Sequence, residues 1–224
     1  AHEWIVEYIK RFHPQASEPM IDYAVITDFH DDHFGSFYAG PKKSSFGNYF
    51  LSGITGVGEY LNFRKLLDRG YPDYNYPVAL KSDSIRAAMM KDSSGAKAYQ
   101  ALENYWGFTE FHVNKSGMIA EKFIAGTDRQ IILTKKPGEF KTFSVQNIKA
   151  NGTIWTGEGT KTSEYFPPLS SGVYVPGENQ LSLALRIDYG DFRYYTGGDC
   201  PGIADLGTPK WNDVETPMSP AIGE

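Results

Sequence analysis

The 224 residues are enough for one domain with a sizeable core, and 41% hydrophobic with 22% charged residues excludes wholesale disorder. The net charge of −5 argues against a broad nucleic-acid-binding face, which needs an excess of basic residues. A single cysteine, Cys200, excludes an internal disulfide framework, and no apolar run approaches the roughly 18 residues of a membrane helix. Composition fixes no compartment, so cytoplasm and periplasm both stay open.

The first elements alternate between helix and strand. Residues 2–12 are predicted as an amphipathic helix, because their apolar residues recur at helical spacing. These residues are Trp4, Ile5, Tyr8, Ile9 and Phe12. Residues 21–27 form a short apolar run and are predicted as a strand buried on both faces. A long loop is expected over 35–58, and then a helix over 57–69 that ends at Gly70.

The later part of the chain is expected to be mostly β-structure. A proline-rich connection over 71–77 and a helix over 96–106 precede a change of period from three or four to two, near residue 108. Strands are predicted over 118–125, 130–134, 142–149 and 153–156. The clearest hairpin joins residues 181–187 to 192–196 through Gly190-Asp191 and ends in Gly197-Gly198-Asp199. We therefore expect a single α/β domain over residues 1–224.

The stretch VITDFHDDHFG (25–35) places two of the five histidines among three aspartates, directly after the apolar strand. If the strand continued, the side chains of Asp28, His30 and Asp32 would point the same way, and His33 would follow after a bend. Such a group can hold two metal ions, and its imidazole and carboxylate ligands suit zinc, iron or manganese. The alternative is a solvated acidic turn.

Two motifs resemble the metallo-β-lactamase superfamily. DFHDDHFG is similar to its His-x-His-x-Asp-His signature, and LALRIDYGDFRYYTGGD looks like its later hairpin, which ends in a metal-bridging aspartate. The spacing is closest to the branch that includes the hydrolase domain of DNA-uptake competence proteins. The resemblance implies a four-layer αβ/βα sandwich with metals at the sheet edge.

The resemblance also implies the roles of single residues. His30 would bind the first metal ion, Asp32 and His33 the second, and Asp199 would bridge them. Asp28 stands where the signature has its first histidine and is taken as an oxygen ligand. Asp32 is the residue that we assign to catalysis as well. Two Zn²⁺ ions are expected, with Mn²⁺ or iron as alternatives, and a metal-bound hydroxide would attack the substrate.

The chain departs from the family pattern in three places. The Gly-His loop before the hairpin corresponds to Gly177-Glu178-Asn179, where Glu178 is either an oxygen ligand or, as we favour, a surface loop residue. The last histidine of the family follows a strand that would lie beyond Glu224, and strands expected before residue 2 are absent. We therefore interpret the chain as a segment of a longer protein, incomplete at both ends.

The other candidate groups have simpler interpretations. His112 is expected to be an ordinary strand or loop residue, and His2 and His13 to face solvent on either side of the first helix. Cys200 follows Asp199 and could approach a metal ion, but a buried free thiol is the favoured interpretation.

The sequence thus predicts a metal-dependent hydrolase acting on a phosphoester or related ester. Nucleic acid as the substrate is not supported by the charge, and no membrane segment is expected. Lactam or lactone hydrolysis is the alternative among enzymes. A non-catalytic binding module with a degenerate metal site is the alternative from another class. The oligomeric state is not predicted.

Overall fold

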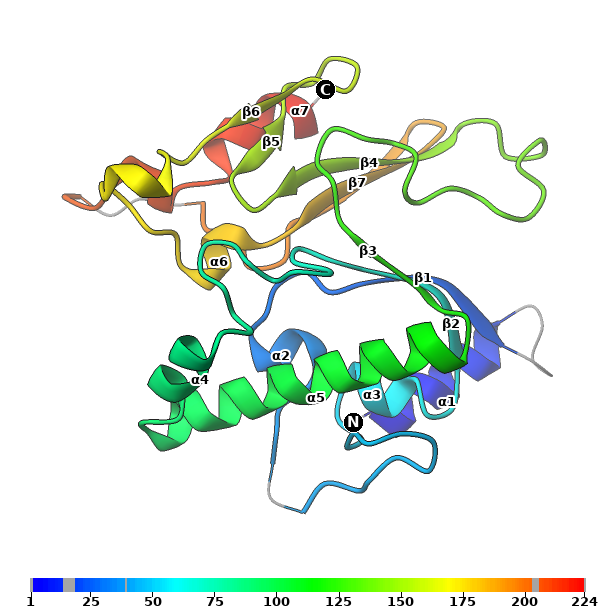
Figure 1. Ribbon diagram of the computed structural model, residues 1–224. Helices are drawn as coiled ribbons and strands as arrows, with labels where there is room; N and C mark the ends of the chain where they lie inside the picture. Colours follow the sequence, from blue (N-terminus) through cyan, green and yellow to red (C-terminus); the bar gives the residue numbers. More distant parts are fainter. Residues whose placement is uncertain (1, 14–18, 39, 203–205, 224) are drawn as a thin grey trace. The chain divides into compact units, whose positions relative to one another are not determined.

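The computed structural model describes residues 2–13, 19–38, 40–202 and 206–223. Its secondary structure comprises a three-stranded sheet with a parallel pair and a five-stranded antiparallel sheet, which confirms the mixed α/β class (Figure 1). The chain divides into two compact units. The first holds Ala1–Leu67 and Tyr71–Glu121, and the second holds Asp68–Gly70 and Lys122–Glu224. The single hydrolase domain over 1–224 stays a prediction.

The first unit combines the three-stranded sheet with five helices in its described part. The helices are α1 (His2–Phe12), α2 (Asp31–Phe34), α3 (Ile54–Val57), α4 (Asp83–Met89) and α5 (Ser93–Lys115). The strands are β1 (Met20–Val25), β2 (Asn62–Asp68) and β3 (Ile119–Lys122), in the order β1-β2-β3. β1 and β2 run parallel, with Ile21 opposite Phe63 and Val25 opposite Leu67.

Helix α5 supplies much of the core of the first unit and contacts α2, α3 and α4 (Figure 1). Its Tyr105 and Phe108 are fully buried in the same apolar cluster as Leu66 of β2. The side chain of Asp92 caps the helix by accepting from the backbone N–H groups of Ser94 and Gly95, which satisfies donors that the first turn leaves free. The core therefore stabilises the sheet of β1 and β2, and the candidate site lies in the loop that follows β1.

The predicted helix over 2–12 is confirmed as α1, with Val6 as its buried residue. The helix predicted over 57–69 is wrong, because residues 62–68 form β2. Tyr60, Phe63 and Leu66 fit helical spacing, but in β2 the exposed Asn62 and Arg64 alternate with the buried Phe63, and only residues 66–68 are buried in succession. Gly70 therefore follows a strand and not a helix.

The change to strand-like period near residue 108 is also wrong, because α5 continues to Lys115. The strand predicted over 118–125 is present in shorter form as β3. Residues 130–134 form no strand. The Gln130 side chain instead accepts from the Ile124 N–H (2.8 Å) and donates to the Lys122 carbonyl (2.8 Å), which ties this segment into a loop.

The second unit is built on the five-stranded sheet, in the order β6-β5-β4-β7-β8. Its strands are β4 (Phe143–Ala150), β5 (Thr153–Trp155), β6 (Thr162–Glu164), β7 (Ala184–Tyr189) and β8 (Phe192–Thr196). Its helices are α6 (Glu178–Leu181) and α7 (Ser219–Ile222), with 3₁₀ turns at Leu169–Ser171, Lys210–Asn212 and Thr216–Met218. Ile148, Ile154, Ala184 and Met218 form a buried core.

The sheet of the second unit confirms the strands predicted over 142–149 and 153–156 and the hairpin of β7 and β8. Gly190 turns the hairpin at a φ of 60°, which a residue with a side chain rarely adopts. None of the helices in the described part of the chain combines the length and the hydrophobicity that crossing a bilayer would require.

Candidate metal site

The predicted ligand loop follows β1 directly. Beyond the strand, the Ile26 N–H still donates to the Leu67 carbonyl of β2 (2.9 Å). The chain then leaves the sheet, and α2 begins at Asp31. The loop therefore extends from the carboxyl ends of two parallel strands, the edge at which open α/β sheets commonly place their sites.

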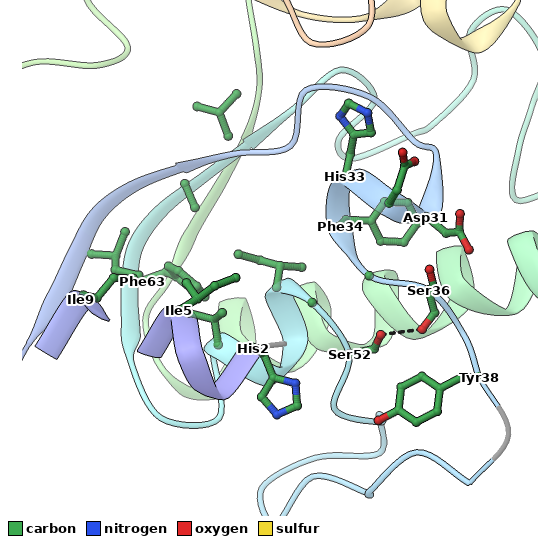
Figure 2. Close-up of a pocket in the computed structure, with 18 residues that line it drawn as sticks. His2, Ile5, Ile9, Asp31, His33, Phe34, Ser36, Tyr38, Ser52 and Phe63 are labelled. Atoms are coloured by element: carbon green, nitrogen blue, oxygen red, sulfur yellow. Dashed lines mark hydrogen bonds between the residues drawn. The ribbon is translucent and has the colours of Figure 1, made fainter. Parts of the chain in front are cut away.

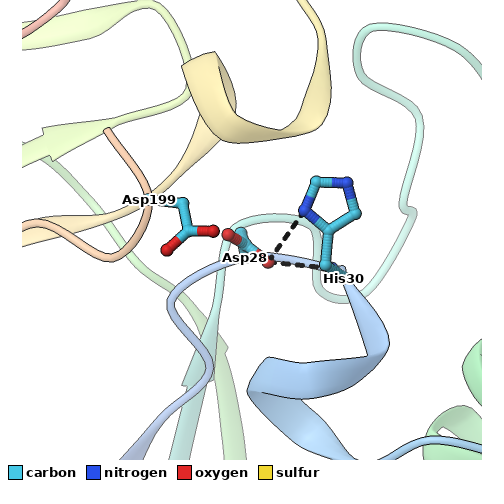
Figure 3. Close-up of side chains that lie close together, drawn as sticks. All are labelled: Asp28, His30 and Asp199. Atoms are coloured by element: carbon cyan, nitrogen blue, oxygen red, sulfur yellow. Dashed lines mark hydrogen bonds and ion pairs between the residues drawn. The ribbon is translucent and has the colours of Figure 1, made fainter. Parts of the chain in front are cut away.

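Asp28 connects the two histidines of this loop. Its side chain is fully buried, and Oδ1 accepts a hydrogen bond from the His30 backbone N–H (2.8 Å), which fixes a tight turn. The His30 ring Nδ1 lies 3.8 Å from the same oxygen, as Figure 3 shows. The His33 ring Nε2 lies 3.5 Å from the other oxygen, Oδ2. One carboxylate thus faces both imidazoles.

The His33 ring is oriented by a second contact. Its Nδ1 is hydrogen-bonded to the Thr27 hydroxyl (2.8 Å), which directs Nε2 toward Asp28. Metal-binding histidines commonly have such a partner on the other ring nitrogen, because it fixes the orientation of the ring. The His33 side chain is 16% exposed, whereas that of His30 is 48% exposed. His30 is therefore the ligand candidate open to an incoming ion.

Asp32 does not join these contacts. The extended conformation expected through residue 32 ends at His30, because residues 31–34 form α2. Asp32 is exposed and lines, together with His33, a cavity of about 670 Å³ in the first unit (Figure 2). The lining also includes apolar residues such as Ile9 and Phe63. The structure thus gathers Asp28, His30 and His33, and leaves Asp32 at the edge of a neighbouring cavity.

Asp199, also drawn in Figure 3, belongs to the second unit and follows β8. Gly198 before it has a φ of 55°, in the region that favours glycine. A side chain on Gly197 would collide with the Tyr195 hydroxyl. These two constraints explain the Gly-Gly pair. The role of Asp199 as a bridging ligand stays a prediction.

Glu178 is not the surface loop residue that we favoured. It begins α6, its side chain is 19% exposed, and both of its oxygens accept from Arg69, from Nε at 2.7 Å and from the terminal nitrogen at 2.5 Å. Such a bidentate pair uses one acceptor site on each of the two carboxylate oxygens. The alternative role of Glu178 as a metal ligand stays a prediction.

His112 lies in α5, so the expectation of a strand or loop residue is wrong. It is buried, with Nε2 hydrogen-bonded to the Tyr49 hydroxyl (3.0 Å) and Nδ1 to the Ser116 hydroxyl (3.0 Å). Burial lowers its pKa below the usual value. Both ring nitrogens are engaged, which fits a core histidine and not a ligand.

His2 and His13 are less exposed than expected, and Cys200 is more exposed than expected. His2 is partly buried and lines the cavity, and burial is the main cause of its lowered pKa. His13 is partly buried, with Nε2 hydrogen-bonded to the Met20 carbonyl (3.1 Å). Cys200 is a thiol of intermediate exposure that donates to the Ser182 carbonyl (3.8 Å), so the buried thiol that we favoured is only half-buried.

Sequence reasoning missed two buried cations of the second unit. Arg69 was assigned to a helix that does not exist, and Lys149 lies in an ordinary strand pattern that carries no sign of burial. Both side chains are almost fully shielded from solvent, Arg69 at 1% exposure and Lys149 at 0%. Burial lowers the pKa of Lys149 to about 8.

Asp28, His30 and His33 offer one carboxylate and two imidazoles, residue types that suit zinc, manganese or iron. The two rings face different oxygens of Asp28, and in the described part of the chain His33 is not a member of any group of three ligand atoms that lie within 4.8 Å of one another. Without an ion, the same geometry allows a protonated histidine to pair with Asp28. Comparison with models of protein families, with curated proteins and with solved structures finds no match.

Proposed function

We propose that the chain is a metal-dependent hydrolase of metallo-β-lactamase type, acting on a phosphoester or a related ester. The observation that carries the proposal is the contact of the buried Asp28 carboxylate with both His30 and His33. The resemblance of DFHDDHFG and YYTGGD to the signatures of that superfamily gives independent support from the sequence. A four-layer sandwich built from the two sheets is part of the same proposal.

Asp28, His30 and His33 would hold the ion, and the resemblance adds Asp32 and Asp199 to its ligands. A bound divalent ion would lower the pKa of a coordinated water molecule and stabilise negative charge on the substrate. Zinc is the first expectation, and manganese and iron are the alternatives because three of the five proposed ligands are carboxylates.

Thr27 and Asp28 would orient the two histidine ligands before an ion binds. Thr27 holds the His33 ring so that Nε2 stays on the side of Asp28. The Asp28 carboxylate fixes the turn to His30 through the backbone N–H of that residue. Asp32 would approach the ion by a change of side-chain rotamer, since its carboxylate lies in an exposed position.

Hydrolysis of three substrate classes tests the proposal. The purified chain, supplied with Zn²⁺ or Mn²⁺, is assayed on an activated phosphodiester, a lactone and a β-lactam. We expect phosphodiester cleavage that falls by about 100-fold or more in Asp32→Ala and His33→Ala, because each variant removes a proposed ligand. Asp22→Ala is the control, because Asp22 pairs with Arg64 on the sheet. Equal rates in all four proteins would contradict the proposal.

The position of Asp32 favours a second candidate, a binding module that holds one ion without catalysis. Asp32 lies outside the contacts among Asp28, His30 and His33, and Asp28 replaces a histidine of the signature. In that case Zn²⁺ binds at one equivalent, His33→Ala abolishes binding, Asp32→Ala does not, and none of the three substrates is cleaved.

A further inference from the structure

Two buried cations of the second unit converge on one short segment, residues 178–182. The Arg69 guanidinium pairs with Glu178 at the start of this segment. The Lys149 ammonium donates to the carbonyls of Gln180 (2.6 Å) and Ser182 (2.8 Å) at its end. Burying a charge is costly unless it is well partnered, so this segment is held by unusually strong local contacts.

Ser182 connects the segment 178–182 to the turn that contains Asp199. Its carbonyl accepts from Lys149 and also from the Cys200 thiol (3.8 Å). Its hydroxyl oxygen accepts from the Asp199 backbone N–H (3.2 Å). Ser182 is fully buried, so water does not compete for these contacts. One serine thereby joins the lysine on β4 to the residue after β8.

The Asp199 turn is also restrained by contacts at Gly197, two residues earlier in the chain. The Cys200 N–H donates to the Gly197 carbonyl (3.1 Å), and the Tyr195 hydroxyl packs against Gly197. Asp199 itself is exposed, so its backbone is held while its carboxylate remains accessible. This is the arrangement that a ligand residue requires, because a fixed backbone limits the directions that the carboxylate can take.

We propose that Lys149 is a positioning residue: through Ser182 it fixes the backbone of the Asp199 turn, and with it the direction of the Asp199 carboxylate. The link to metal binding rests on the proposed function, whereas the link between Lys149 and the turn does not. The acceptors of Lys149 are the backbone carbonyls of Gln180 and Ser182, so its hydrogen bonds restrain the backbone of this segment directly.

Amide hydrogen exchange of the full chain tests the mechanical link. Lys149→Met removes the ammonium and keeps much of the side-chain length, and Ser182→Ala removes the acceptor of the Asp199 N–H. Both should raise the exchange rate of the Asp199 amide by about tenfold. Lys161→Met is the matched control, because Lys161 is exposed and pairs only with the neighbouring Glu158 in the described structure.

The exchange rate of the Asp199 amide in the two variants decides between the outcomes. Faster exchange at Asp199 in both variants, with the control unchanged, supports the proposal. Unchanged exchange at Asp199 in folded Lys149→Met overturns it. If Lys149→Met does not fold, Ser182→Ala decides, and unchanged exchange at Asp199 in that variant overturns the proposal.

Zn²⁺ affinity separates positioning from general stabilisation. We expect Lys149→Met to weaken Zn²⁺ binding by about tenfold in the native background and to have no further effect beside Asp199→Asn, since both changes act on one ligand. Equal weakening in both backgrounds would overturn the proposal. If Asp199→Asn alone leaves Zn²⁺ binding unchanged, the assignment of Asp199 as a ligand fails, and the exchange rates alone decide the role of Lys149.

Discussion

In the first unit, the candidate ligands contact one another through their side chains. The Asp28 carboxylate lies between the rings of His30 and His33, and the Thr27 hydroxyl is hydrogen-bonded to the other nitrogen of the His33 ring. In the second unit, Asp199 is held through its backbone, by Ser182 and a buried lysine. The first arrangement orients both imidazoles toward one carboxylate, whereas the second fixes the backbone and leaves Asp199 exposed. The two kinds of support should therefore respond differently to mutation.

The largest loss in the free energy of unfolding is expected when the second unit loses the buried charge of Arg69. Arg69→Met leaves the Glu178 carboxylate, 19% exposed, without its bidentate partner. Breaking such a pair costs about 3–5 kcal/mol, so we expect a loss of about 3 kcal/mol in the free energy of unfolding, measured by urea denaturation. Arg69→Met combined with Glu178→Gln should recover part of the loss. A loss below about 1 kcal/mol in the single variant would show that the pair does not support the unit.

A smaller effect is expected from the titration of Lys149, whose pKa burial lowers from 10.5 to about 8. Below pH 8 both the folded and the unfolded chain keep the proton, so this group causes no pH dependence. Between pH 8 and 10.5 the folded chain releases the proton while the unfolded chain keeps it, so the free energy of unfolding rises with pH. The gain from pH 8 to 9.5 is about 1.5 kcal/mol.

Urea denaturation at pH 7, 8 and 9.5 measures this gain. Tyrosines with raised pKa values, such as Tyr195, titrate at the alkaline end and act in the opposite direction. The difference between the native protein and Lys149→Met therefore isolates the lysine. Parallel pH curves for the two proteins would refute the titration of Lys149 in this range.

The smallest effect is expected in the first unit, where Thr27→Val removes the hydroxyl that orients His33 and keeps the shape of the side chain. Zn²⁺ affinity should fall by about tenfold, with the free energy of unfolding nearly unchanged. Ser116→Ala is the control, because it removes a hydroxyl from the ring of His112, which is not a proposed ligand. The same Zn²⁺ affinity in Thr27→Val and the native protein would mean that Asp28 alone orients the ring.

Local patterns predicted what depends on local spacing. Strand β1, helix α1 and the β7–β8 hairpin were found because their apolar periods or turn residues decide their conformation. The cluster at 28–33 was found because its ligands are neighbours in the sequence. Strand β2 was missed because Phe63, Leu66 and Leu67 also fit helical spacing, and only pairing with β1 distinguishes the two conformations.

The supports around the candidate ligands could not be predicted. Lys149 lies 33 residues before Ser182 in the chain, and Arg69 lies 109 residues before Glu178. Nothing in the residues around Lys149 or Arg69 indicates that either side chain is buried. The departure of Asp32 from the cluster was missed for a different reason, because the start of α2 at Asp31 ends the alternation on which the prediction depended.

The metal content of the purified chain shows whether His30 and His33 bind a metal ion. The chain is purified without added metal, beside a His30→Ala/His33→Ala variant, and metals are quantified by mass spectrometry against protein concentration. We expect one to two equivalents of zinc, manganese or iron in the native protein and none in the variant. No bound metal in the native protein, even after incubation with Zn²⁺ or Mn²⁺, would contradict the hydrolase and leave Asp28, His30 and His33 as an ion-paired turn.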